Sequence, residues 1–171
     1  MKVAFTEICK TGNHYEISDA SWFPEQDVQR SGPINAAVTL NRKGDSRVEV
    51  QGVLTTEVTL VCDRCLAEYG FAVDVRFHLV LEVPAEEHWH VKDIACSTTD
   101  LDTVQLLEPV VDVQDVLRQQ LYLSLPEKFL CRDHCKGLCA TCGVDRNTVG
   151  CGCENGRSRS PFAVLAALKK K

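Results

Sequence analysis

Apolar and polar residues alternate most regularly over residues 47–61 and again over residues 71–83. Such alternation is typical of strands that turn one face to a core. The residues CDRCLAEYG join the two segments, which predicts an antiparallel hairpin with Cys62 and Cys65 at its tip. The core face should carry Val48, Val50, Gly52, Leu54, Val58 and Leu60 of the first strand, and Phe71, Val73, Val75, Phe77, Leu79 and Leu81 of the second.

A helical period appears over residues 112–124. Asp112 is a candidate N-cap, Pro126 ends the pattern, and the buried stripe should be Val113, Val116, Leu117 and Leu121. A second, short helix is expected from Ser160 onward, in SPFAVLAALKKK. Elsewhere we expect a short edge strand within 2–9, a buried apolar island at residues 22–24, a strand over 34–40 and an irregular acidic loop over 84–108.

These elements predict an α+β fold. A sheet with one apolar face needs a cover, and the helix at 112–124 supplies it. We therefore expect an antiparallel β-sheet with packed helices, followed by a Cys-rich C-terminal segment whose zinc-binding chemistry is argued from its cysteines below. The expected division is an α+β domain over residues 1–125, which bears the CxxC hairpin, and a segment over 126–171 with the clustered cysteines and the end helix.

Composition is that of an ordinary globular protein, with 171 residues of which 44% are hydrophobic and 25% charged. No run of 18 apolar residues occurs, so no membrane span is expected. The first residues, MKVAFTEICKTGNHYEI, lack the apolar region of a secretion signal. The expected compartment is the reducing cytoplasm.

Ten cysteines then change the picture, because eight of them form four close pairs. In a reducing compartment clustered thiols are more often metal ligands than disulfides, although disulfides in an exported protein are the alternative. Zinc takes four thiolates when its role is structural, so four pairs supply two zinc sites. The candidate ligands are Cys62, Cys65, Cys131, Cys135, Cys139, Cys142, Cys151 and Cys153.

The spacing between the cysteines indicates how the four pairs could combine into two sites. Cys139-Ala-Thr-Cys142-Gly has the form of a zinc knuckle, and Cys151-Gly-Cys153 can complete a local site. The pairs left over would tie the hairpin tip to the segment after the helix, with His134 as a possible replacement for Cys131 or Cys135.

Catalysis has little support in this sequence. A redox CxxC needs a strand followed by a helix that lowers the thiol pKa, whereas Cys62 and Cys65 join two strands. A catalytic zinc keeps an open coordination position, which a set of four cysteines lacks. No phosphate-binding loop, H-E-x-x-H or nucleophile elbow occurs. We expect a protein that is not an enzyme.

Charge is unevenly distributed along the chain. Residues 1–125 carry 10 basic and 20 acidic residues, whereas residues 126–171 carry nine basic and four acidic ones. Any surface for a polyanion such as RNA is therefore expected in the C-terminal segment, although from charge alone an ordinary charged tail is the alternative. The candidate RNA-binding residues are Lys128, Arg132, Lys136, Arg146, Arg157 and Arg159, with the Lys169–Lys171 run.

The chain contains, in order, CDRC between two strands, DVLRQQLYLSLP, LCRDHCKGLCATCG…CGC and PFAVLAALKKK. Together these motifs resemble the YceD-like family of large-ribosomal-RNA accumulation proteins, over about residues 45–171. The resemblance implies a role in 23S ribosomal RNA accumulation or processing, with no established catalytic activity. Some members lack the distal cysteines, which implies that Cys139, Cys142, Cys151 and Cys153 form an accessory module. It also favours pairing Cys62 and Cys65 with the region 131–135.

The leading hypothesis is thus a non-enzymatic, zinc-stabilised factor for large-subunit biogenesis. Its expected partners are ribosomal RNA or pre-large-subunit particles, with no membrane. The alternatives are a protein-interaction adaptor that does not touch RNA and, third, a thiol-redox or zinc-hydrolase enzyme.

Overall fold

The chain divides into two compact units in a computed structural model that describes residues 1–9, 11–84 and 103–153. Unit 1 comprises Met1–Thr59 and Gly70–Pro126, and unit 2 comprises Leu60–Tyr69 with the described part of Glu127–Lys171. The tip of the hairpin therefore groups with the cysteine-rich segment rather than with the rest of residues 1–125. The second helix predicted from Ser160 onward lies outside the described residues.

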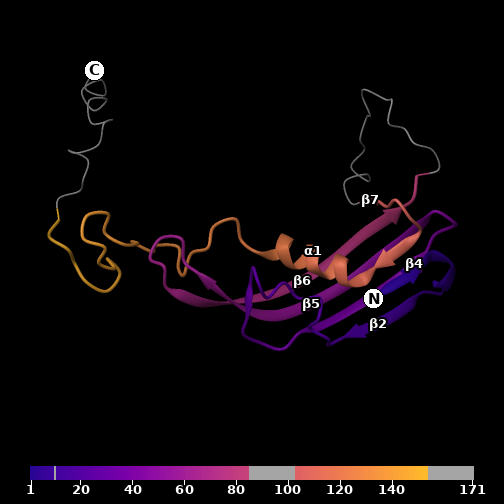
Figure 1. Ribbon diagram of the computed structural model, residues 1–171, viewed down its shortest axis with the longest axis horizontal. Helices are drawn as coiled ribbons and strands as arrows, with labels where there is room; N and C mark the ends of the chain where they lie inside the picture. The colour runs from indigo at the N-terminus through magenta and orange to yellow at the C-terminus, as the bar shows by residue number, and fades with distance from the viewer. Residues whose placement is uncertain (10, 85–102, 154–171) are drawn as a thin grey trace, which may run out of the picture. The chain divides into compact units, whose positions relative to one another are not determined.

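The main sheet is built around the predicted hairpin (Figure 1). Its order is β2 (Asn13–Ile17), β4 (Asn35–Arg42), β5 (Arg47–Val61), β6 (Glu68–Glu82) and β7 (Thr103–Gln105), while β3 (Gln29–Arg30) pairs with β5. At one end of the hairpin Val83 N donates to Ser46 O at 2.8 Å. At the other end Cys62 N donates to Ala67 O at 2.9 Å. The pairing of β5 with β6 is thus antiparallel, as predicted.

The edge of this sheet differs from the prediction. β7 runs parallel to β6, with Val80 opposite Thr103, so the sheet is mixed rather than wholly antiparallel. β7 also falls inside residues 84–108, which were predicted to be irregular. With three residues, β7 is too short to show the two-residue alternation of a strand. The strand at the opposite edge, β2, was not predicted either, because its sequence NHYEI is too polar to show that alternation.

A second, two-stranded sheet pairs β1 (Lys2–Ala4) antiparallel with β8 (Val110–Asp112). β1 is shorter than the strand predicted within 2–9 because the chain turns into a 3-10 helix at Phe5–Glu7. Immediately after β8, α1 (Val113–Ser124) begins. Its N-cap is Asp112, whose side chain accepts hydrogen bonds from the backbone N–H groups of Gln114 and Asp115.

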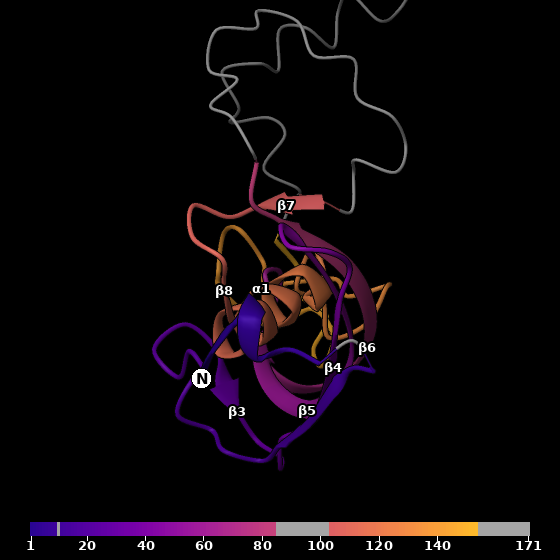
Figure 2. The ribbon, with the colours of Figure 1, turned by 90° about the vertical axis from the view of Figure 1, so that its right-hand side faces the viewer.

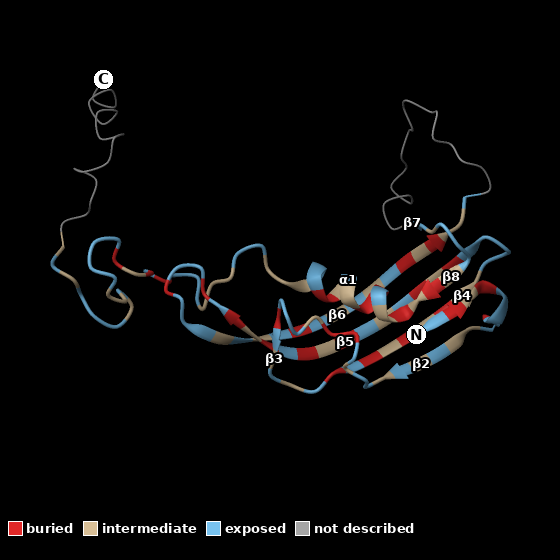
Figure 3. Ribbon diagram, in the orientation of Figure 1, coloured by how far each residue is buried: buried red, intermediate tan, exposed pale blue. Residues whose placement is uncertain are grey.

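The core of unit 1 follows the predicted periods. Figure 2 shows the sheet curving around α1, whose buried residues are the predicted Val113, Val116, Leu117 and Leu121. Buried positions alternate along β5, as Figure 3 shows, and Trp22 and Phe23 are also buried. On β6 the prediction holds for Val73, Leu79 and Leu81, whereas Phe71, Val75 and Phe77 are only half-buried.

The described residues are thus mostly sheet with a single α-helix. None of the helices in the described part of the chain is long and apolar enough to cross a membrane.

Candidate metal centres

Unit 2 contains two turns with the same hydrogen-bond pattern, each around a CxxC pair. In the first, Leu66 N donates to Cys62 O and Cys62 N donates to Ala67 O, both at 2.9 Å. In the second, Gly143 N donates to Cys139 O and Cys139 N donates to Val144 O, both at 2.8 Å. The two pairs are therefore presented by one kind of turn.

This turn requires a left-handed backbone directly after the second cysteine. Gly143 meets the requirement with φ of 75°. In the first turn Leu66 adopts φ of 60°, and it is the one non-glycine residue with positive φ in the described part of the chain. A leucine there is strained by about 1 kcal/mol or more, and its side chain is 64% exposed.

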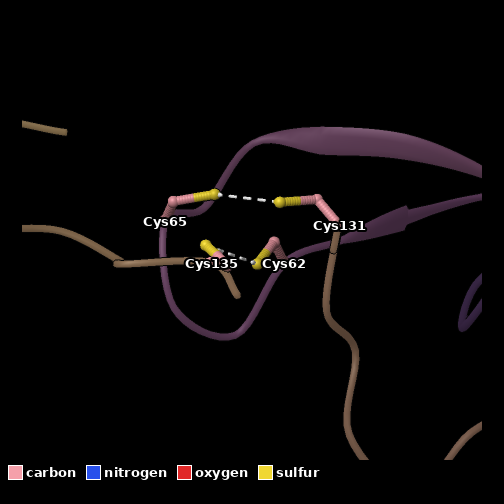
Figure 4. Close-up of side chains that lie close together, drawn as sticks. All are labelled: Cys62, Cys65, Cys131 and Cys135. Carbon is pink, nitrogen blue, oxygen red and sulfur yellow. Dashed lines mark hydrogen bonds between the residues drawn. The ribbon is translucent and has the colours of Figure 1, made fainter. Parts of the chain in front are cut away.

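The first centre is formed by Cys62, Cys65, Cys131 and Cys135, whose sulfur atoms all lie within 4.8 Å of one another. Figure 4 shows the four side chains pointing toward one another, two from the hairpin tip and two from the later segment. The Sγ atoms of Cys62 and Cys135 are 3.8 Å apart, and those of Cys65 and Cys131 are 3.7 Å apart.

These separations can be compared with two kinds of sulfur chemistry. A disulfide needs sulfurs about 2.05 Å apart. Four thiolates placed about 2.3 Å from one zinc ion at tetrahedral angles lie about 3.8 Å from each other. Both measured separations are too long for a disulfide and match the spacing of two thiolates on one tetrahedral metal ion.

Hydrogen bonds from both backbone and side-chain groups hold the later segment against the hairpin tip. Asp63 N donates to Phe129 O at 2.7 Å, and Phe129 N donates to the Asp63 carboxylate at 2.8 Å. The guanidinium of Arg64 donates to Cys135 O at 3.0 Å, and Arg64 O accepts from Leu138 N at 2.9 Å. The first centre is therefore framed by hydrogen bonds that do not involve sulfur.

Gly137 makes this close approach possible. Its φ is 66°, and a Cβ atom added to it would lie 2.7 Å from Arg64 O. A side chain at this position would push the segment away from the hairpin tip.

The second centre is local in sequence. Cys139, Cys142, Cys151 and Cys153 also bring four sulfur atoms within 4.8 Å of one another. Cys139 is buried, Cys142 is exposed and the other two are half-buried. An isolated bridge between Leu138 and Asp145 supports the loop that joins the two cysteine pairs.

Thiol acidity differs sharply within each centre. The backbone N–H of Cys131 lowers the pKa of Cys62 to about 6, and the backbone N–H groups of Cys142 and Thr141 lower that of Cys139 to about 6. Burial raises the pKa of Cys131 to about 12, and the hydrogen bond with Cys142 raises that of Cys153 to about 11. Without metal, each centre thus combines at least one thiol whose pKa is lowered with others whose pKa is raised.

Burial acts to raise the pKa of Cys135 as well, but hydrogen bonds from the Asn147 side chain and the Gly137 N–H outweigh it and leave that pKa lowered. His134, considered as a replacement ligand, is exposed and belongs to neither group of four.

The candidate RNA-binding residues fall into two sets. Lys128, Arg132, Lys136 and Arg146 are exposed, and no ion pair within the described residues engages their side chains. Arg157, Arg159 and the Lys169–Lys171 run lie outside the described residues.

Sequence reasoning missed the residues that support the cysteines. Asp63 and Arg64 occupy the middle of the CDRC motif, whose recognisable pattern consists of the two cysteines alone. Asn147 lies between two cysteine pairs with no motif of its own, and its role is visible only from its contact with Cys135 Sγ at 3.3 Å. The asparagine signal was weak because a surface loop commonly contains one.

Comparison with known proteins gives relatives in plants and bacteria. The chain is 28% identical over 149 residues to the chloroplastic large ribosomal RNA subunit accumulation protein YCED homolog 1 of Zea mays, covering 74% of this chain and 50% of the relative. For the protein of the same name from Arabidopsis thaliana the identity is 25% over 167 residues, covering 85% and 51%. An uncharacterized protein of Mycobacterium leprae (strain TN) is 26% identical over 118 residues, covering 68% and 51%.

The chain thus spans about half the length of the curated relatives it matches. No solved structure matches it. The family model described as large ribosomal RNA subunit accumulation protein YceD matches residues 50–169, a range that contains both groups of four cysteines. On this match, the chain belongs to the YceD family.

Proposed function

We propose that the chain is a non-enzymatic factor, stabilised by two structural zinc ions, that supports the accumulation or processing of 23S ribosomal RNA during large-subunit biogenesis in the cytoplasm. The observation that carries this proposal is the presence of two groups of four cysteines in the same unit as exposed basic residues that form no ion pair with the described residues, in a member of a family named for ribosomal RNA accumulation. Four sulfur ligands at each centre leave no open position for a reacting water, which favours a structural role over catalysis.

Zinc fits both groups chemically. Thiolates are soft ligands, and a tetrahedral set of four is typical of structural zinc. Zinc at the first centre would be held by Cys62 and Cys65 from the hairpin together with Cys131 and Cys135, and at the second by the four local cysteines. A zinc ion at either centre would cross-link separate parts of the chain, so the free energy of zinc binding would add to the folding stability of unit 2.

RNA contact is assigned to the exposed basic residues of unit 2. Lys136 N donates to the Asn147 side chain at 2.8 Å, and Arg146 N donates to Gly137 O at 3.0 Å, so the backbones that carry these two cations are already ordered. Little further entropy is lost when they bind phosphate. The proposed contact set is Lys128, Arg132, Lys136 and Arg146, extended by Arg157 and Arg159.

Charge reversal tests this assignment. The triple variant R132E/K136E/R146E should lose association with large-subunit precursor particles on sucrose gradients while its zinc content stays unchanged. A matched control, K2E/R47E/R76E, places the same change in charge on exposed residues of unit 1 and should associate normally. Binding of the unmodified protein should also weaken with salt. For each phosphate that the protein neutralises, a tenfold rise in salt concentration should lower the affinity by roughly tenfold.

The acidic excess of residues 1–125 favours one competing function, that of an adaptor which binds basic proteins. In that case the control variant would itself be expected to alter association, and the variant in unit 2 would associate normally. This result would favour an adaptor that reaches the precursor particles through a protein over one that contacts RNA directly.

A further inference from the structure

Asn147 makes contacts that cannot be predicted from its position in the sequence. It lies in the loop between the two cysteine pairs of the second centre, yet its Nδ2 group donates to Cys135 Sγ of the first centre at 3.3 Å. Its Oδ1 accepts from Lys136 N at 2.8 Å, so one half-buried side chain binds both a metal-ligating sulfur and the backbone next to it.

Asn147 is held in this position by the loop itself. The Asp145 carboxylate accepts hydrogen bonds from the backbone N–H of Asn147 at 2.9 Å and from its Nδ2 at 2.7 Å. The loop in turn lies along the segment between the centres, through Arg146 N to Gly137 O at 3.0 Å and the bridge of Leu138 with Asp145. The position of the amide therefore depends on the conformation of the loop.

Metal at the second centre fixes that conformation. The loop residues 143–150 run between Cys142 and Cys151, which are ligands of one ion when the centre is filled. An ion closes the loop and removes most of its alternative conformations, whereas an empty centre leaves the loop ends tied only by hydrogen bonds.

Hydrogen bonds to a metal ligand from groups outside the coordination sphere orient it and tune its basicity, and their loss typically lowers metal affinity by 10- to 100-fold. An N–H donor directed at sulfur stabilises the thiolate form, which is the form that binds metal.

We propose that Asn147 couples the two centres, so that metal bound at the second centre strengthens metal binding at the first. The inference rests on the proposed occupancy of both centres by zinc. Because coupling between two binding sites is reciprocal, filling the first centre strengthens the second by the same factor. Asn147 acts as a positioning residue, through Cys135, and does not itself touch the metal.

The test measures the occupancy of each centre separately. Zinc-loaded full-length protein is titrated with a competing chelator, free cysteines are alkylated, and mass spectrometry reports protection of the first-centre and second-centre cysteines. The second centre is removed with C142S/C151S, which takes one ligand from each of its pairs. Asn147 is changed to Ala, and to Asp, which keeps the oxygen that accepts from Lys136 N but loses the donor to sulfur.

The expected result is that C142S/C151S, N147A and N147D each raise the free zinc concentration for half-occupancy of the first centre by about 10- to 100-fold. Combining N147A with C142S/C151S should add little to either change, because both remove the same interaction. The neighbouring substitution Val149→Ala, at an exposed side chain in the same loop, should have no effect.

The coupling would be overturned if N147A and N147D left the zinc affinity of the first centre unchanged. It would also be overturned if the losses of affinity caused by N147A and by C142S/C151S simply multiplied in the combined variant. Either result would leave two zinc sites in place. An unmodified protein that binds no zinc would overturn the proposed metal role itself, and the coupling with it.

Discussion

Replacing Gly137 by alanine tests how the first centre is assembled. The left-handed backbone at this position costs alanine about 1–2 kcal/mol. The new Cβ would also lie 2.7 Å from Arg64 O, so the segment must shift and weaken the hydrogen bond from Leu138 N to Arg64 O, now 2.9 Å long, at a cost of about 1 kcal/mol. Together these amount to about 2–3 kcal/mol, and the first centre should bind zinc about 30- to 150-fold more weakly.

Gly143→Ala is a matched control. Gly143 has a similar φ of 75°, but nothing lies within 4 Å of the Cβ that alanine would add. It should therefore carry the backbone cost alone, at the second centre. The assay is chelator competition with site-resolved alkylation, applied to both variants.

Gly137→Ala is expected to weaken its centre by about fivefold more than Gly143→Ala weakens its own, which corresponds to the extra 1 kcal/mol of crowding. Equal losses in the two variants would show that the approach of Arg64 O to Gly137 does not matter. Normal zinc binding by Gly137→Ala would refute the whole account of how this segment docks.

Three further outcomes are expected. Leu66→Asn should tighten zinc binding at the first centre by about fivefold, because asparagine tolerates positive φ better than leucine; an unchanged affinity would indicate that Leu66 is not strained. Because Cys62 and Cys139 each have a pKa lowered to about 6, at least one thiol per centre is already ionised at pH 7.5, and zinc uptake should release fewer than four protons per ion when calorimetry is compared across buffers; release of four would contradict the lowered values. Gly52→Ala should lower the free energy of unfolding of unit 1 by about 1–3 kcal/mol, since its Cβ would collide with the Phe77 ring, and zinc content should stay the same. A drop in zinc content would contradict the expectation that the core of unit 1 and the metal centres of unit 2 are independent.

The hairpin, the buried stripe of α1 and the N-cap Asp112 could be predicted because each depends on a local period or a local hydrogen bond. The parallel pairing of β7 could not be, because three residues carry no period and the partner strand lies far back in the sequence. Strand pairing of this kind is decided by the tertiary structure around it.

The candidate centres show the same limit. Counting pairs of cysteines gave the two groups of four, since ligand number and knuckle spacing are visible in the sequence. The supporting contacts were not visible, because the pairing of Asp63 with Phe129 and of Asn147 with Cys135 follows from how separate turns meet. Sequence indicates which residues could bind a metal better than it indicates which residues would support those ligands.

The separation of the candidate ligands along the chain also implies an order of assembly during synthesis. All four candidate ligands of the second centre emerge within 15 consecutive residues, whereas Cys65 precedes Cys131 by 66 positions. At about 5–20 residues per second, the hairpin thiols wait roughly 3–13 s for their partners. During that interval Cys62 and Cys65 are open to oxidation or to the wrong metal, and any product that ends before residue 131 keeps them in that state.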